Sequence, residues 1–374
     1  MLTQEGPKLL EDVSVWLLYP QGSRLEAVYT VGSITADRYL AVPGSKLPAV
    51  EAFMHQLNGR QSLEEIQAAL IREHGFQMDV AALHRKFSRA GLLAQSGSRQ
   101  AGDIQEMSTT FLRLPIDRLL GWLQLFSPTL MPLVFLGTAF ILSAIGLLVV
   151  EPSFLRLMAM PTAGSLSQVK TAAMAVLIGL LSVVLHELSH CFVASRWGIL
   201  TGTLRVQLYL GTIPIVGLKL AGLYTLPPRG RIAVWSAGVF TNLSITAAAL
   251  VAIRTVAPGS AALGLTAAIN WLLAIFNLMP LLPTDGYFML CTLVKDSNVR
   301  VRAWSWVRRP FHHDRQRPSV FVLAYIVATV WLLLNTLRHL VLRIANGQSW
   351  LSLALLALFL VTLWRTFRRT EDMD

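Results

Sequence analysis

Six long apolar segments limit what this chain can fold into. Each segment is long enough to cross the hydrocarbon core of a bilayer, which is about 30 Å thick. Hydrophobic residues make up 54% of the chain and charged residues 14%, whereas soluble domains carry about 25% charged residues. This argues against a soluble enzyme, a coiled coil or a disordered protein, and it predicts an α-helical multi-pass membrane protein with six transmembrane helices. The segments are 128–150, 172–195, 232–253, 261–282, 319–337 and 350–366.

The positive charge of the chain lies in its apolar part. The net charge is +11, yet residues 1–110 carry ten Lys and Arg against twelve Asp and Glu. The rest of the chain carries 22 basic against 9 acidic side chains. Basic residues that flank apolar helices are typical of membrane orientation and of contact with anionic lipid headgroups. We therefore expect a lipid bilayer as a partner and no nucleic acid.

The distribution of basic residues predicts an orientation in the membrane. The loop 295–318 carries seven Lys and Arg, whereas the loops 151–171, 254–260 and 338–349 carry five between them. Basic loops stay on the cytoplasmic side, and the polar residues 1–110 contain no signal peptide. We expect a bacterial inner or plasma membrane with both termini in the cytoplasm.

Residues 1–95 have the outline of a small α+β, winged-helix-like cytosolic domain. Alternating apolar residues and turn signals between 13 and 41 predict short strands. Ser62 and Glu65 form a capping box for one helix, and Asp79 can cap a second helix that ends before Gly91. DNA binding is disfavoured because the domain is acidic and lacks a basic recognition face.

Two further segments are not predicted to be membrane-spanning helices. Residues 96–127 are expected to form a linker and then an amphipathic segment, Phe111–Phe126, on the inner membrane surface. Residues 199–231 are apolar but rich in Gly and Pro, with alternation that indicates strands. Strands at membrane depth must satisfy their backbone within the protein, so we expect a re-entrant β-hairpin; an interfacial loop is the alternative. Residues 128–374 then form the six-helix domain.

A metal-binding pattern lies inside the second apolar segment. Acidic residues are costly at membrane depth, so Glu187 indicates a functional site. It stands between His186 and His190, which lie on one face of a helix and can hold a zinc ion, with the glutamate as general base. The alternative is that both histidines form hydrogen bonds with neighbouring helices.

Asp285 is the candidate third ligand. A catalytic zinc needs three protein ligands and one open position. The stretch from Asn277 contains two prolines and ends in Asp285 and Gly286, so the helix breaks and the carboxylate can turn inward. A role as helix N-cap is the alternative for Asp285. We expect one zinc ion per chain on His186, His190 and Asp285, with Asn277 either as an oxyanion donor or as a helix cap.

These motifs together resemble the site-2 protease family of intramembrane zinc metalloproteases, over residues 110–370. Gly238 and Asn242 also resemble the G-x-x-x-N helix of that family. The resemblance implies a site-2 protease core, with zinc on the three ligands and Glu187 as the catalytic residue. It also implies that Gly238, Asn242 and Asn277 support the substrate or the transition state. Two features depart from the family: Tyr287 follows Gly286 where many relatives have glycine, and no PDZ-like insertion is present.

The sequence at 285–290, the segment 113–120 and the N-terminal domain resemble a narrower subgroup, the peptide zinc metalloproteases. Members of this subgroup accompany ribosomally made, modified peptides and their exporters. The N-terminal domain is similar to a peptide-chaperone winged helix that grips leader peptides. A cytosolic packing domain without a ligand is the alternative for residues 1–95.

The resemblance implies an enzyme, a zinc metalloendopeptidase that cuts a peptide bond near the cytoplasmic face. Its substrate would be a peptide or a membrane protein, and its role would be to mature a ribosomally made peptide or remove its leader. A leader peptide on residues 1–95 and a peptide exporter are the implied partners. The alternative is a non-proteolytic membrane peptide-binding protein, such as an exporter accessory or an immunity factor, which would tolerate loss of Glu187. Cys191 and Cys291 are expected to be buried thiols, because two cysteines provide no disulfide framework.

The predicted orientation can be tested by cysteine labelling. A probe introduced as Asp314→Cys lies in the basic loop 295–318, which the positive-inside rule assigns to the cytoplasm. A membrane-impermeant maleimide added to intact cells should leave it unlabelled and should label it after permeabilisation. Equal labelling before permeabilisation would overturn the topology.

Overall fold

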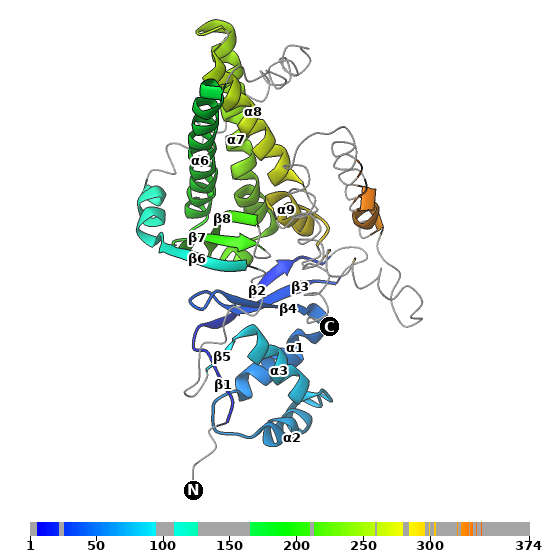
Figure 1. Ribbon diagram of the computed structural model, residues 1–374. Helices are drawn as coiled ribbons and strands as arrows, with labels where there is room; N and C mark the ends of the chain where they lie inside the picture. Colours follow the sequence, from blue (N-terminus) through cyan, green and yellow to red (C-terminus); the bar gives the residue numbers. More distant parts are fainter. Residues whose placement is uncertain are drawn as a thin grey trace. The chain divides into compact units, whose positions relative to one another are not determined.

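The computed structural model describes most of the chain, in two compact units (Figure 1). The first unit comprises Met1–Glu106, Ile199–Gly202 and Lys219–Arg231, and the second unit comprises the remainder. The structure describes residues 6–21, 26–94, 108–125, 165–209, 213–258, 260–279 and 284–295, together with separate positions between 299 and 338.

The N-terminal part of the first unit combines two small sheets with three helices. The larger sheet is antiparallel with the strand order β2-β3-β4, and a second sheet pairs β1 with β5. Val31, Phe53, Ile66 and Phe87 are fully buried between the sheet and the helices. The elements are β1 (Lys8–Leu9), β2 (Val13–Tyr19), β3 (Val28–Ser33), β4 (Arg38–Pro43), η1 (Gly44–Lys46), α1 (Leu47–Gln56), α2 (Leu63–His74), α3 (Val80–Ala90) and β5 (Leu93–Ala94).

The helix boundaries in this unit follow local sequence signals. The Ser62 hydroxyl accepts from the Glu65 N–H at 3.2 Å, and the Glu65 carboxylate accepts from the Ser62 N–H at 2.8 Å, which confirms the capping box. Asp79 accepts from the Ala82 N–H at 2.7 Å. α3 ends at Ala90, and its C-cap Gly91 has a φ of 69°, which glycine adopts at little cost.

Lys219–Arg231, which lies far along the chain, belongs to the first unit. It contains the short helix η2 (Leu223–Thr225). The Tyr39 hydroxyl accepts from the Gly222 N–H at 2.7 Å, and the Lys219 ammonium lies 2.9 Å from the Asp37 carboxylate. The pKa of the Tyr39 phenol is raised by burial and by the charge of Asp37, so the phenol stays protonated.

Arg231 makes a second set of contacts with the N-terminal strands. Its side chain is 1% exposed, its Nη2 donates to the Leu18 carbonyl, and its guanidinium lies 4.7 Å from the centre of the Tyr19 ring. A buried guanidinium is costly unless it is paired. Residues 1–95 therefore form one folded unit together with residues from the later part of the chain.

The second unit consists of long helices and one three-stranded sheet. The helices α6, α7 and α8 lie side by side (Figure 1), and the sheet has the order β6-β7-β8. The elements are β6 (Ser108–Pro115), α6 (Ser165–Arg196), β7 (Gly202–Tyr209), β8 (Ile213–Leu220), α7 (Pro228–Thr255), α8 (Ala261–Leu278) and α9 (Asp285–Leu293).

Three helices are long and apolar enough to cross a membrane: Ala173–Arg196, Pro228–Thr255 and Ala261–Leu278. They coincide with three of the six predicted segments. The segments 128–150 and 350–366 lie outside the described residues, and only separate positions of 319–337 are described. One face of α6 exposes Val176, Leu177, Leu180, Leu181 and Val184, each by more than half, as expected of a surface that faces lipid.

The hairpin predicted within 199–231 is present as β7 and β8, and its depth in a membrane remains a prediction. Phe111–Phe126, expected to be one amphipathic segment, instead divides into strand β6 and a helix over 117–125. β6 pairs antiparallel with β7, with Leu114 opposite Leu204. Pairing satisfies backbone groups that a single segment on the membrane surface would leave to the solvent.

The contact between Tyr39 and Gly222 predicts a measurable loss in Tyr39→Phe. The variant keeps the ring but removes the acceptor of a buried N–H, which costs about 1–3 kcal/mol. Amide exchange in residues 219–231 should become faster in hydrogen–deuterium exchange. Tyr29→Phe is the matched control, because the described residues form no hydrogen bond with the Tyr29 hydroxyl. Equal exchange in the two variants would contradict the role of Tyr39.

Candidate metal centre

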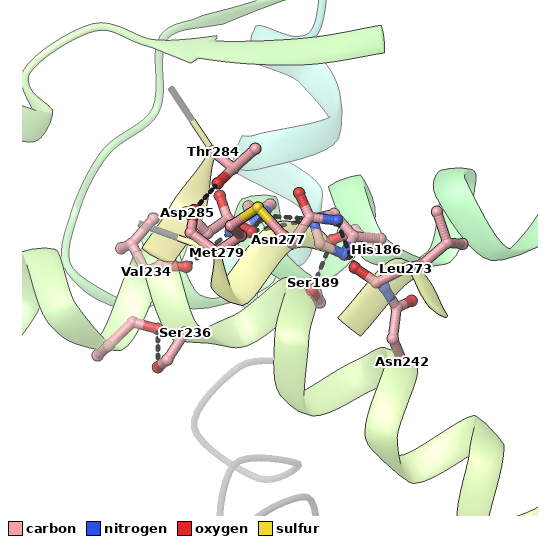
Figure 2. A network of polar contacts seen from close by, with 12 residues as sticks. His186, Ser189, Val234, Ser236, Asn242, Leu273, Asn277, Met279, Thr284 and Asp285 are labelled. Carbon is pink, nitrogen blue, oxygen red and sulfur yellow. Dashed lines mark hydrogen bonds and ion pairs between the residues drawn. The ribbon is translucent and has the colours of Figure 1, made fainter. Parts of the chain in front are cut away.

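Two histidines one turn apart on α6 begin the site, and Figure 2 labels the first of them, His186. His186 and His190 are each 5% exposed, and their Nε2 atoms lie 3.2 Å apart. Residues four apart lie on one face of a helix, so the spacing in the sequence is sufficient to bring the two rings together. The prediction that they form a pair is confirmed.

Asp285 completes a cluster of three possible metal ligands. Its Oδ2 atom lies 3.1 Å from His186 Nε2 and 3.3 Å from His190 Nε2, and the ligand atoms of all three residues lie within 4.8 Å of one another. Asp285 is the first residue of α9, and Thr284 occupies the N-cap position. The carboxylate therefore faces the imidazoles and does not serve as the predicted alternative, a helix cap.

The start of α9 at Asp285 is held by two local features. The Thr284 hydroxyl donates to the Met279 carbonyl at 2.9 Å (Figure 2). A methyl group on Gly286 would overlap the Leu278 carbonyl, so the start of α9 can approach the end of α8 this closely only with glycine. Together these contacts direct the carboxylate of Asp285 toward α6.

The chemistry of this cluster fits a metal ion. Oδ2 of Asp285 is buried and has no hydrogen-bond donor of suitable geometry in the described part of the chain. A buried carboxylate beside two imidazole nitrogens needs a proton or a cation between them, because a buried anion without a partner is strongly destabilised. Two histidines and a carboxylate are a common ligand set of catalytic zinc sites, which keep a fourth position open.

Helix α7 supports both imidazoles from the side opposite Asp285. His190 Nδ1 lies 2.6 Å from the Val234 carbonyl, and the Asn242 amide lies 3.0 Å from His186 Nδ1. Between these contacts, a methyl group on Gly238 would overlap the His186 ring. The structure thus places Gly238 and Asn242 against His186, a possible metal ligand. Their support of a substrate or transition state remains a prediction.

Glu187 and Asn277 lie outside the ligand cluster. Glu187 neighbours His186 on α6 and is partly buried, whereas His186, His190 and Asp285 are buried. The Asn277 amide donates to the Leu273 carbonyl one turn earlier in α8, at 3.0 Å. Its role as an oxyanion donor remains a prediction.

Several residues that support the site were not predicted from the sequence. Val234 acts through its backbone carbonyl, which has no sequence signature. A buried amide, Asn270, donates to the Ser182 hydroxyl at 2.9 Å and joins α8 to α6. Polar residues inside apolar segments are typical of such contacts between helices, so the sequence could have predicted a contact at Asn270. Cys191 and Cys291 are buried and form no disulfide, as predicted.

Comparison with protein-family models, with curated proteins and with solved structures found no match to this chain. The chemistry of the site therefore rests on its own residues and distances.

The close approach of Gly238 to His186 predicts a severe effect of Gly238→Ala. The added methyl group would displace the imidazole, and zinc affinity should fall by about tenfold or more, measured by competition with a chromogenic chelator. Gly179→Ala on α6 is the matched control, because a Cβ there meets nothing within 4 Å. Equal zinc affinity in the two variants would show that Gly238 does not set the position of the ring.

Proposed function

We propose that this chain is an intramembrane zinc metalloprotease of the site-2 protease type. The observation that carries the proposal is that His186, His190 and Asp285 are buried and converge. The two histidines come from α6, which is apolar enough to cross a membrane, and Asp285 is the first residue of α9. Glu187 lies beside this cluster on α6. The sequence resemblance to site-2 proteases supports the same assignment.

The proposed role of each of these residues follows from its chemistry. A zinc ion held by the three ligands would lower the pKa of a water molecule to about 7 and polarise a peptide carbonyl. Glu187 accepts the proton of the attacking water and delivers it to the leaving nitrogen. The water oxygen bonds to the carbonyl carbon, the C–N bond breaks, and the products are a carboxylate and an amine.

The proposed cleavage lies near the cytoplasmic face of a bacterial inner or plasma membrane. His190 precedes the end of α6 at Arg196 by six residues, which is about 9 Å along a helix. Arg196 and the exposed Trp197 at this end are typical of a membrane interface. With both termini in the cytoplasm, the site opens toward that side.

The proposed substrate is a ribosomally made peptide that the enzyme matures or whose leader it removes. A helical peptide hides its carbonyls, so the substrate must be extended at the site. β8 is the end strand of its sheet in the described chain, and such an edge can add a peptide as a further strand. A leader peptide on the N-terminal sheet and a peptide exporter are the proposed partners.

The proposed binding of a leader peptide by the N-terminal domain can be tested by substitutions but not by deletion of the domain. Deletion of residues 1–95 would remove the Leu18 carbonyl and the Tyr19 ring from the buried Arg231. A change in activity after deletion would then report disruption of α7 as well as loss of leader binding. Substitutions on exposed strand positions avoid this because they leave Arg231 paired.

The decisive variant for catalysis is Glu187→Gln. The change removes the proton acceptor but no ligand, so cleavage should fall by about 10²–10⁴-fold while zinc stays at one ion per chain. Activity is measured on extended fluorogenic peptides with full-length protein in detergent, and zinc by elemental analysis. His190→Ala is the comparison, since it should lose both zinc and cleavage.

A Glu187→Gln variant with full activity would exclude Glu187 as the base. A wild-type protein that binds zinc but cleaves no peptide, alone or with a precursor, would instead favour the non-proteolytic peptide-binding alternative.

A further inference from the structure

One face of α7 contacts both histidine ligands. Val234, Gly238 and Asn242 stand four residues apart, so they lie in a row on that face. Each of the three touches or closely approaches an imidazole ring of α6. The two ends of the row meet the Nδ1 atoms, the ring nitrogens that do not face Asp285.

At one end of this row, the backbone determines the tautomer of His190. The Val234 carbonyl can only accept a hydrogen bond, so the proton of His190 must lie on Nδ1, 2.6 Å away. Nε2 then keeps its lone pair and faces His186 and Asp285. This is the tautomer that a metal ligand bound through Nε2 requires.

At the other end of the row, His186 also needs a free lone pair on Nε2 to bind a metal, but its Nδ1 faces a side-chain amide instead of a carbonyl. Asn242 Nδ2 lies 3.0 Å from His186 Nδ1, and an amide N–H donating there would place the ring proton on Nε2, where it would block a metal. Asn242 is fully buried, and its Oδ1 has no hydrogen-bond partner among the described residues. A half-turn of the amide exchanges nitrogen and oxygen without changing its shape.

We propose that Asn242 is a positioning residue of the metal centre: in the zinc-bound protein its Oδ1 accepts the Nδ1–H of His186 and holds that ring in the metal-binding tautomer. This inference rests on the metal site of the proposed function. Rotation of the amide satisfies the buried oxygen and makes the Nε2 lone pair of His186 available to the metal. His186 and His190 then match, each donating from Nδ1 to an oxygen of α7.

The surroundings of Asn242 hold it in place. The Thr246 hydroxyl, one turn further along α7, donates to the Asn242 carbonyl at 2.9 Å and lies 3.4 Å from the Ala267 carbonyl of α8. The backbone that carries the amide is therefore tied to a second helix. A ligand with an oxygen acceptor on its second nitrogen gains basicity and a fixed orientation.

The experiment measures zinc affinity with the full-length protein in detergent, using zinc alone and a competing chelator. Asn242→Leu has the shape of asparagine without the acceptor, and its affinity should fall by about 10–100-fold. Asn242→Asp keeps an oxygen acceptor and should bind zinc at least as tightly as the wild type. Asn270→Leu is the matched control. This amide is also fully buried, and its Oδ1 likewise has no hydrogen-bond partner in the described part of the chain, but its nitrogen bonds to Ser182 and Thr266 instead of an imidazole.

The proposal is overturned if Asn242→Leu binds zinc like the wild type, if Asn242→Asp is as weak as Asn242→Leu, or if Asn270→Leu loses as much affinity. Wild-type protein whose zinc binding is absent, or survives His190→Ala, would instead refute the proposed metal site. A second measurement needs no change at Asn242: ¹H–¹⁵N correlation spectra of the zinc-loaded protein should show a proton on Nδ1 of His186, identified by its loss in His186→Gln. A proton on Nε2 would overturn the inference even if the leucine variant failed to fold.

Discussion

The structure around the site depends on one electrostatic constraint. A carboxylate and two imidazoles are buried within about 3 Å of one another, where a charge without a partner is strongly destabilised. A shared cation would remove this penalty, and the neighbouring contacts hold the three side chains in place. Gly286 lets Asp285 approach, Gly238 leaves space for the His186 ring, and the Val234 carbonyl orients His190.

Helix α7 links this site to the N-terminal strands through one continuous backbone. Arg231, in its first turn, is paired with Leu18 and Tyr19 within the first unit. Val234 follows three residues later and accepts from His190. The start of α7 thus draws its support from residues 1–95, which accounts for the inclusion of 219–231 in the first unit. The N-terminal domain is consequently more than a tethered binding module.

The apolar helices separate their polar residues from their outer faces. Val176, Leu180 and Val184 of α6 are exposed, whereas Ser182 is buried with Asn270 of α8. Hydrogen bonds between helices are useful in a lipid environment because apolar packing alone gains little there. This hydrogen bond also fixes the position of α6 against α8. It thereby helps to fix His186 and His190, which lie on α6, relative to Asp285, which follows α8.

Much of the site was predictable because its signals are local. The pair of His186 and His190 follows from helix periodicity, the helix caps at Ser62 and Asp79 from side-chain reach, and the turn at Asp285 from its prolines and glycine. The tertiary structure alone decided the pairing of β6 with β7, the inclusion of Arg231 in the first unit, and the use of the Val234 carbonyl as an acceptor. These depend on contacts between distant segments, and a backbone carbonyl is the same group in every residue. Its role is therefore set by where folding places it, and no residue type in the sequence can reveal it.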